Sequence, residues 1–205
     1  MVNDEAGAIA RFVARATQGT VGAAARRAVF AAVRDLPYAT DAAADAVTLV
    51  RVGRGNCAAK AALLARGLRL LGADARLVRW RYRLPAWPPE VGLLPSRDDL
   101  HTAVEVAVAG SWIVVDATHD PPLARGGLVV GDWDGWHQTA PAYAPDGPIW
   151  REGPDDTAIA DALAALAAQY HGRDAALTTA YRDAFDAWLG QLRAPSSPEA
   201  GGAVR

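Results

Sequence analysis

Arg54–Leu64 reads Arg-Gly-Asn-Cys-Ala-Ala-Lys-Ala-Ala-Leu-Leu and contains Cys57, the only cysteine of this 205-residue chain. Apolar residues at helical spacing continue to Leu71, and Gly72 then supplies a C-terminal cap. The pattern predicts a helix from Cys57 to Leu71 with a thiol at its N-terminus. Free backbone N–H groups and the helix dipole favour a thiolate there, which is the nucleophilic form. The alternative interpretation is a small apolar residue that opens a buried helix.

Patterns on both sides of this segment predict helices and strands. The alternating run Val-Arg-Trp-Arg-Tyr-Arg-Leu predicts a strand with one buried face and one solvated face. Its Arg residues and the Pro- and Trp-rich loop after it are candidate substrate contacts. The predicted elements are helices at 4–18, 21–35 and 57–71, a polar connection from the second helix to Leu49, a strand at 78–84, a loop at 85–100, hairpin strands at 101–108 and 112–116, terminal helices within 155–193 and a disordered tail at 194–205.

The hairpin contains a histidine and an aspartate that could act together. His101 opens its first strand, and Asp116 ends its second. Their positions have the parity of one sheet face, but the distance between them depends on the turn. A turn at Ala109-Gly110 makes Asp116 a diagonal neighbour of His101, within about 7 Å. A turn at Gly110-Ser111 instead pairs Asp116 with Glu105, and both registers are compatible with the sequence.

Cys57, His101 and Asp116 are the residue types that nucleophilic acyl transfer requires. A histidine accepts the thiol proton and later protonates the leaving group, while an aspartate fixes the tautomer of the imidazole. Backbone N–H groups at the helix start can stabilise an oxyanion. His119 and Asp120 offer a metal site as an alternative, but the sequence has no His-x-x-x-His motif or cysteine pair. We therefore expect no metal and no cofactor.

The segments around these residues resemble the transglutaminase-like superfamily. Four of them match the superfamily's motifs in order and spacing: Arg54–Leu64, Leu68–Val78, His101–Val106 and Ser111–Thr118. The resemblance covers about residues 25–125. It implies a papain-like α+β fold whose nucleophile lies at a helix N-terminus, packed on an antiparallel sheet. We expect a core at about 25–145 within a single domain of residues 1–193, with extra helices at both ends.

The resemblance also implies an enzyme that acts on an amide or peptide bond through a thioester. In such an enzyme Cys57 is the nucleophile, His101 the general base and acid, and Asp116 the orienting carboxylate. Tyr38 and Arg51 are upstream candidates for the second oxyanion donor. We expect hydrolysis of a peptide, protein or small amide, as in stand-alone bacterial members of this kind. The alternatives are transfer to an amine acceptor, or a binding module that keeps the fold without turnover.

Composition argues against several other classes of protein. The formal net charge of −2 gives no drive toward nucleic acid or an anionic membrane. A single cysteine excludes an intramolecular disulfide and suits a reducing compartment. The acidic N-terminus lacks a signal-peptide pattern, and no apolar run is long enough to span a bilayer. We therefore expect a cytoplasmic protein without nucleic-acid or membrane partners, whose oligomeric state the sequence does not indicate.

Overall fold

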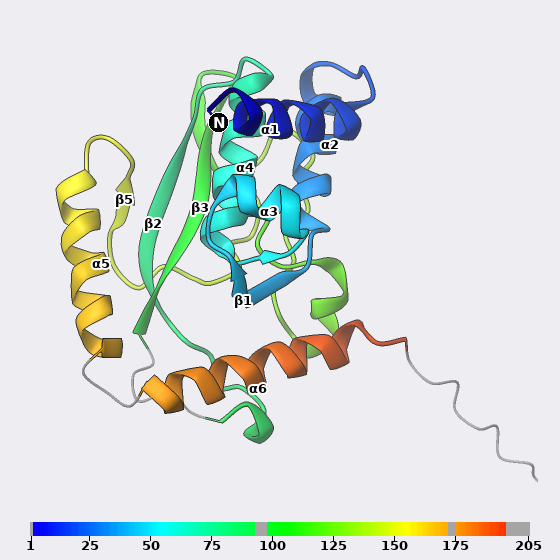
Figure 1. The fold of residues 1–205 in the computed structure, drawn as a ribbon. Helices are drawn as coiled ribbons and strands as arrows, with labels where there is room; N and C mark the ends of the chain where they lie inside the picture. Colours follow the sequence, from blue (N-terminus) through cyan, green and yellow to red (C-terminus); the bar gives the residue numbers. More distant parts are fainter. Residues whose placement is uncertain (1, 93–97, 172–174, 196–205) are drawn as a thin grey trace, which may run out of the picture.

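A four-stranded antiparallel sheet of order β4-β3-β2-β5 forms the centre of the fold (Figure 1). The structure is a computed structural model that describes residues 2–92, 98–171 and 175–195. The helices are α1 (Val2–Thr17), α2 (Gly22–Arg34), α3 (Ala46–Val52), α4 (Cys57–Leu70), α5 (Asp156–His171) and α6 (Ala175–Arg193). The strands are β1 (Tyr38–Ala43), β2 (Ala75–Arg83), β3 (Asp98–Val108), β4 (Ser111–Val115) and β5 (Ile149–Arg151), and two short 3-10 helices are η1 (Pro89–Val91) and η2 (Pro121–Gly126). The predicted α+β class is confirmed.

Helix α4 packs against β3 and β2 and lies at the centre of the main core. Leu64 and Leu68 of α4 are fully buried, as are Val104 and Val106 of β3. Each such side chain stabilises the fold by about 1.5–3 kcal/mol through burial of apolar surface. The helix ends at Leu70, and Gly72 follows with a φ of 78°. The predicted glycine cap is therefore present, and the helix that begins at Cys57 is anchored along its length by apolar packing.

The segment between α2 and α4 differs from the sequence prediction. The predicted polar connection to Leu49 is wrong, because the chain forms β1 and α3 there. The Asp45 side chain caps α3 by accepting hydrogen bonds from the N–H groups of Val47 (3.0 Å) and Thr48 (2.9 Å). Strand β1 lies outside the sheet and bridges to Gly55. Its short, Ala-rich sequence has too weak a periodicity to predict a strand that is held by a distant partner.

The strand boundaries also need correction. β2 begins at Ala75 and β3 at Asp98, each three residues before the predicted start, because the whole of β2 pairs with β3 from Asp98 to Val106. β4 ends at Val115, so Asp116 follows the strand instead of ending it. β5 was not predicted, because three residues are too few for a detectable alternation. In the predicted loop 85–100, η1 forms and the last residues belong to β3, while residues 93–97 lie outside the described residues.

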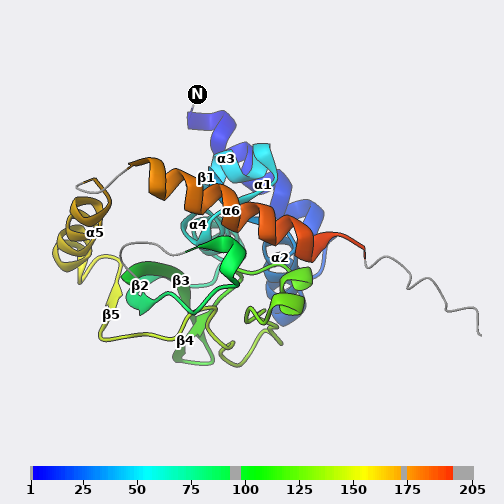
Figure 2. The ribbon, with the colours of Figure 1, turned by 90° about the horizontal axis from the view of Figure 1, so that it is seen from below.

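The two predicted terminal helices are present as α5 and α6. Helix α5 lies beside β5, whereas α6 runs across one end of the molecule, as Figures 1 and 2 show. The predicted disordered tail at 194–205 falls mostly outside the described residues, which end at 195. Within the described part of the chain, none of the helices has the length and apolar character needed to cross a membrane.

Candidate active site

Cys57 is the first residue of α4, and backbone contacts fix the turn that leads into it. The Asn56 side chain caps the helix by accepting a hydrogen bond from the N–H of Ala59 at 3.0 Å. The Asn56 N–H donates to the Ala43 oxygen of β1 at 3.1 Å. A Cβ on Gly55 would lie 2.8 Å from that same oxygen, so this approach requires glycine. Strand β1 thus positions the helix N-terminus, where the Cys57 thiol is half-buried.

The hairpin turn is Ala109-Gly110, because its two flanking residues pair with each other. Both turn residues have positive φ, 51° and 82°, as in the turns whose twist suits a two-residue hairpin. This is the first of the two registers compatible with the sequence. It brings His101 Nε2 to 2.8 Å from Asp116 Oδ2.

The His101–Asp116 pair is buried, with exposures of 0 % and 2 %. Burial disfavours the imidazolium, but the Asp116 carboxylate outweighs it and, with a smaller contribution from Cys57, raises the pKa of His101 to about 10. Burial likewise disfavours the carboxylate, yet His101 keeps the pKa of Asp116 well below its usual value. The carboxylate also accepts hydrogen bonds from the N–H groups of Ala142 (2.7 Å) and Thr118 (3.0 Å). These donors hold Asp116 in the orientation that meets the imidazole.

The second ring nitrogen of His101, Nδ1, is buried and makes no hydrogen bond of normal geometry within the described residues. The Cys57 thiol nevertheless lies near enough to the ring to raise the pKa of His101. Because Nε2 is bonded to Asp116, Nδ1 is the nitrogen left for the thiol. The ring packs against Trp80 and Tyr143, with centroid distances of 4.9 and 5.2 Å. Contacts between a thiol and a base are often long before substrate binds.

Lys60, one turn after Cys57, is completely buried and connects three segments around the site. Its three acceptors are the backbone oxygens of Arg34 (2.9 Å), Leu36 (2.7 Å) and Thr118 (2.6 Å). An ammonium group has three N–H bonds, one for each acceptor. Burial lowers the pKa of Lys60 to about 7, which the nearby Asp120 and Asp116 carboxylates partly oppose. This role was not predicted from the sequence. The signal for it is that the only lysine of the chain lies within an apolar helix.

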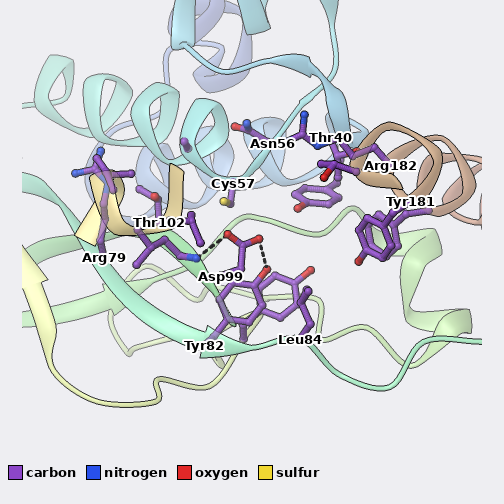
Figure 3. A pocket seen from close by; sticks show the side chains of 18 of the residues that line it. Thr40, Asn56, Cys57, Arg79, Tyr82, Leu84, Asp99, Thr102, Tyr181 and Arg182 are labelled. Atoms are coloured by element: carbon purple, nitrogen blue, oxygen red, sulfur yellow. Dashed lines mark hydrogen bonds between the residues drawn. The ribbon is translucent and has the colours of Figure 1, made fainter. Parts of the chain in front are cut away.

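A pocket of about 320 Å³ lies beside Cys57 (Figure 3). Its walls come from β1, α4, β2, β3, α5 and α6, and six of the residues that line it are aromatic. These are Tyr38, Tyr82, Trp87, Tyr143, Tyr181 and Phe185. Of the predicted substrate contacts, Arg79 and Trp87 line the pocket, whereas Arg81 and Arg83 are exposed elsewhere on β2.

Helix α6 forms one wall of this pocket and is tied to the segments around it. The Asp186 carboxylate accepts hydrogen bonds from the N–H and Oγ1 of Thr40 at 3.0 and 2.9 Å. Arg193 binds the Asp120 carboxylate through two nitrogens, at 2.8 and 2.7 Å. Such a bidentate ion pair fixes both position and angle. The C-terminal helix therefore limits the size of the space around Cys57.

Of the remaining residues singled out from the sequence, some line the pocket and others lie outside it. Tyr38 lines the pocket, whereas Arg51 is exposed on α3. His119 lies 2.8 Å from the Val129 oxygen through Nδ1 and 3.1 Å from the Tyr143 hydroxyl through Nε2. Burial lowers the pKa of His119 to about 4, so the ring is neutral near pH 7. Each of its nitrogens has a structural partner. In residues 2–92, 98–171 and 175–195, no three His, Cys, Asp or Glu side chains are arranged to hold a metal ion.

This combination of a helix-terminal thiol, an antiparallel sheet and a buried His–Asp pair defines a papain-like α+β protein. The sequence profile of the transglutaminase-like superfamily matches residues 8–117, more than half of the chain. The chain therefore belongs to the transglutaminase-like superfamily, and the predicted fold is confirmed.

The solved structures that are similar to this chain include the following two. One is a TGase, with 15% sequence identity and a TM-score of 0.42 over 58% of this chain and 32% of its own. The other is described as a "putative cysteine protease" from Cytophaga hutchinsonii, with 16% identity and a TM-score of 0.43 over 72% of this chain and 50% of its own. The chain thus spans a third to a half of their lengths. No curated protein matches it.

Proposed function

We propose that this protein is a cysteine hydrolase that cleaves an amide or peptide bond through a thioester on Cys57. In this proposal His101 is the general base and acid, and Asp116 orients its ring. The observation that supports this most directly is the 2.8 Å contact between His101 Nε2 and Asp116 Oδ2. That contact fixes the ring and leaves Nδ1 free to exchange a proton with the Cys57 thiol.

The first half of the reaction forms the thioester. Because the pKa of His101 is raised to about 10, Nδ1 already holds the thiol proton near pH 7, and the Cys57 thiolate attacks the carbonyl carbon. Nδ1 then donates this proton to the nitrogen of the leaving amine as the C–N bond breaks. The raised pKa of His101 favours the proton acceptance, and the adjacent Asp116 carboxylate stabilises the imidazolium.

Two groups can stabilise the oxyanion of the tetrahedral intermediate. The first N–H groups of α4 have no acceptor within the helix, and the Asn56 side chain occupies only that of Ala59. Tyr38 supplies a hydroxyl in the pocket beside Cys57. Burial, followed by the neighbouring Tyr143 and Cys57, raises the pKa of Tyr38 well above its ordinary value, so the hydroxyl stays protonated and able to donate.

The second half of the reaction is attack by water. Thr40, Asn56 and Thr102 line the pocket together with Cys57 and supply polar groups that can hold a water molecule. His101 Nδ1 accepts a proton from this water as it adds to the thioester. Breakdown of the second tetrahedral intermediate releases the carboxylic acid and restores the Cys57 thiolate beside the protonated His101.

Alkylation of Cys57 with iodoacetamide tests this proposal at a single site, because the chain has no other cysteine. We expect the native protein to react at least about tenfold faster than the urea-unfolded chain near pH 7, since a positioned base assists the thiol. His101→Ala should remove this advantage, while His137→Ala, at an exposed histidine, should keep it. A native thiol no faster than the unfolded one would contradict the proposal.

A peptide library then identifies the bond that is cleaved. Brief mixing with the native enzyme, followed by acid quenching and intact-mass spectrometry, should reveal an acyl group on Cys57 that disappears with time as free acid is released. Accumulation of products coupled to an added amine would instead indicate acyl transfer.

A further inference from the structure

Asp99 places a carboxylate in the pocket beside Cys57. It precedes His101 by two residues on β3, so both side chains lie on the same face of the strand. In Figure 3 the Asp99 side chain points into the pocket, below Cys57. No other Asp or Glu among the described residues lines this pocket.

The hydrogen bonds of Asp99 leave part of its carboxylate unused. Oδ1 accepts from the neighbouring Leu100 N–H at 2.7 Å, and Oδ2 accepts a long bond from the Tyr82 hydroxyl at 3.3 Å. A carboxylate has about four acceptor positions. Within the described residues, no Arg or Lys side chain donates a hydrogen bond to it. Burial raises the pKa of Asp99, and the two hydrogen bonds together with the charges of His101 and Arg182 only partly oppose this rise.

The surroundings of Asp99 suit a cation better than an anion. The Tyr82 and Tyr143 rings stack on each other at 4.2 Å, and four further aromatic residues line the pocket: Tyr38, Trp87, Tyr181 and Phe185. Ring faces attract cations and add to the effect of a carboxylate. Arg79 and Arg182 also line the pocket, but Figure 3 places them at opposite sides of it. Arg182 is exposed, so solvent screens its charge more strongly than that of Asp99.

We propose that Asp99 binds a positively charged nitrogen of the substrate, so that Cys57 acts on amides that carry an ammonium group close to the scissile bond. This proposal rests on the hydrolytic function proposed above and adds the substrate class. The ammonium becomes the directly hydrogen-bonded cation that Asp99 lacks among the described residues, where His101 and Arg182 act on it only through space. The size of the pocket suits a small amide or the end of a peptide.

Three methanethiosulfonates test the charge preference at Cys57: the cationic aminoethyl, the neutral methyl and the anionic sulfonatoethyl reagent. Rates with the native full chain are divided by those with 2-mercaptoethanol. We expect the normalised rate of the cationic reagent to exceed that of the neutral one. Asp99→Asn should lower the ratio of these two rates on the order of tenfold. Asp98→Asn removes the same charge from an exposed neighbour on the opposite strand face and should leave the ratio unchanged. A preference for the anionic reagent, or an unchanged ratio in Asp99→Asn, would overturn the proposal.

A pair of amides gives a second readout. One carries a free α-amino group, and the other is its N-acetylated form. We expect mass spectrometry to find the Cys57 acyl-enzyme mainly with the free amine, and Asp99→Asn to reduce this preference. Equal acylation by both amides overturns the charge proposal and leaves the hydrolase proposal standing. An unreactive Cys57 in the iodoacetamide assay, with no acylation by either amide, overturns both.

Discussion

Replacing Asp116 with Asn should destabilise the protein by an amount that depends on pH. The substitution keeps the shape of the side chain but removes the negative charge that faces His101 at 2.8 Å. It also turns an amide NH2 toward one of the donors that now meet the carboxylate, the N–H of Ala142 or of Thr118. Without the carboxylate, burial favours the neutral form of His101.

The magnitude follows from the pKa of His101. The rise from 6.5 to about 10 corresponds to about 5 kcal/mol at about 1.36 kcal/mol per unit. Removal of one partner from a buried ion pair typically costs about 3–5 kcal/mol, which is consistent. A group whose pKa is raised by folding stabilises the protein fully below its unfolded value, and this contribution is lost as the pH rises through the folded value. The free energy of unfolding of the wild type should therefore exceed that of Asp116→Asn by about 3–5 kcal/mol at pH 6, and by progressively less toward pH 10.

Urea unfolding followed by tryptophan fluorescence, at intervals from pH 6 to 9.5, measures this difference. Lys60 titrates in the same window, but with the opposite sign: folding lowers its pKa from 10.5 to about 7, so its contribution grows as the pH rises. Subtraction of the variant from the wild type cancels most of that contribution. The part that remains arises because Asp116 raises the pKa of Lys60, and it too makes the difference largest at low pH. Asp132→Asn, at an exposed carboxylate, is the matched charge control. A difference that stays constant over this range, or is below about 1 kcal/mol at pH 6, would refute the reasoning.

Two further substitutions test the contacts that hold the site together. Lys60→Met should cost roughly 3 kcal/mol in urea unfolding, because one buried and two partly buried carbonyl oxygens lose their donor, and a loss below about 1 kcal/mol would contradict that role. Gly131→Ala should cost about 2–3 kcal/mol, because its Cβ would lie 2.3 Å from the Asp116 backbone oxygen. Gly190→Ala, in open space on α6, is the control and should be neutral or slightly stabilising; equal unfolding midpoints for the two alanine variants would count against this packing argument.

The sequence predicted the helix that begins at Cys57 and the parity of the hairpin, but not the hairpin register. Helical periodicity and a glycine cap are local signals, so the placement of Cys57 at a helix start could be read directly. The register depended on Ala109 adopting a positive φ, which alanine does only when the paired strands require it. Local preference alone did not decide between the two possible turns.

The pocket was harder to predict, because its residues come from distant parts of the chain. Tyr38 was one of two candidates for the oxyanion site, and its strand was missed. Asp99 was assigned to a loop, although it lies in β3 opposite Tyr82. Its position depends on pairing between two strands and on the C-terminal helix that closes the pocket, neither of which leaves a periodic signal near residue 99.

The sequence by itself determined which chemistry the chain can offer: a thiol at a helix start, and a histidine and an aspartate on one face of a hairpin. These follow from periods of 3.6 and 2 residues, which the backbone imposes locally. The tertiary structure alone decided the contact between His101 and Asp116, the burial of Lys60 and the charge of the pocket at Asp99. The reason is physical: hydrogen-bond partners, loss of hydration and the walls of a cavity depend on residues that only the folded chain brings together.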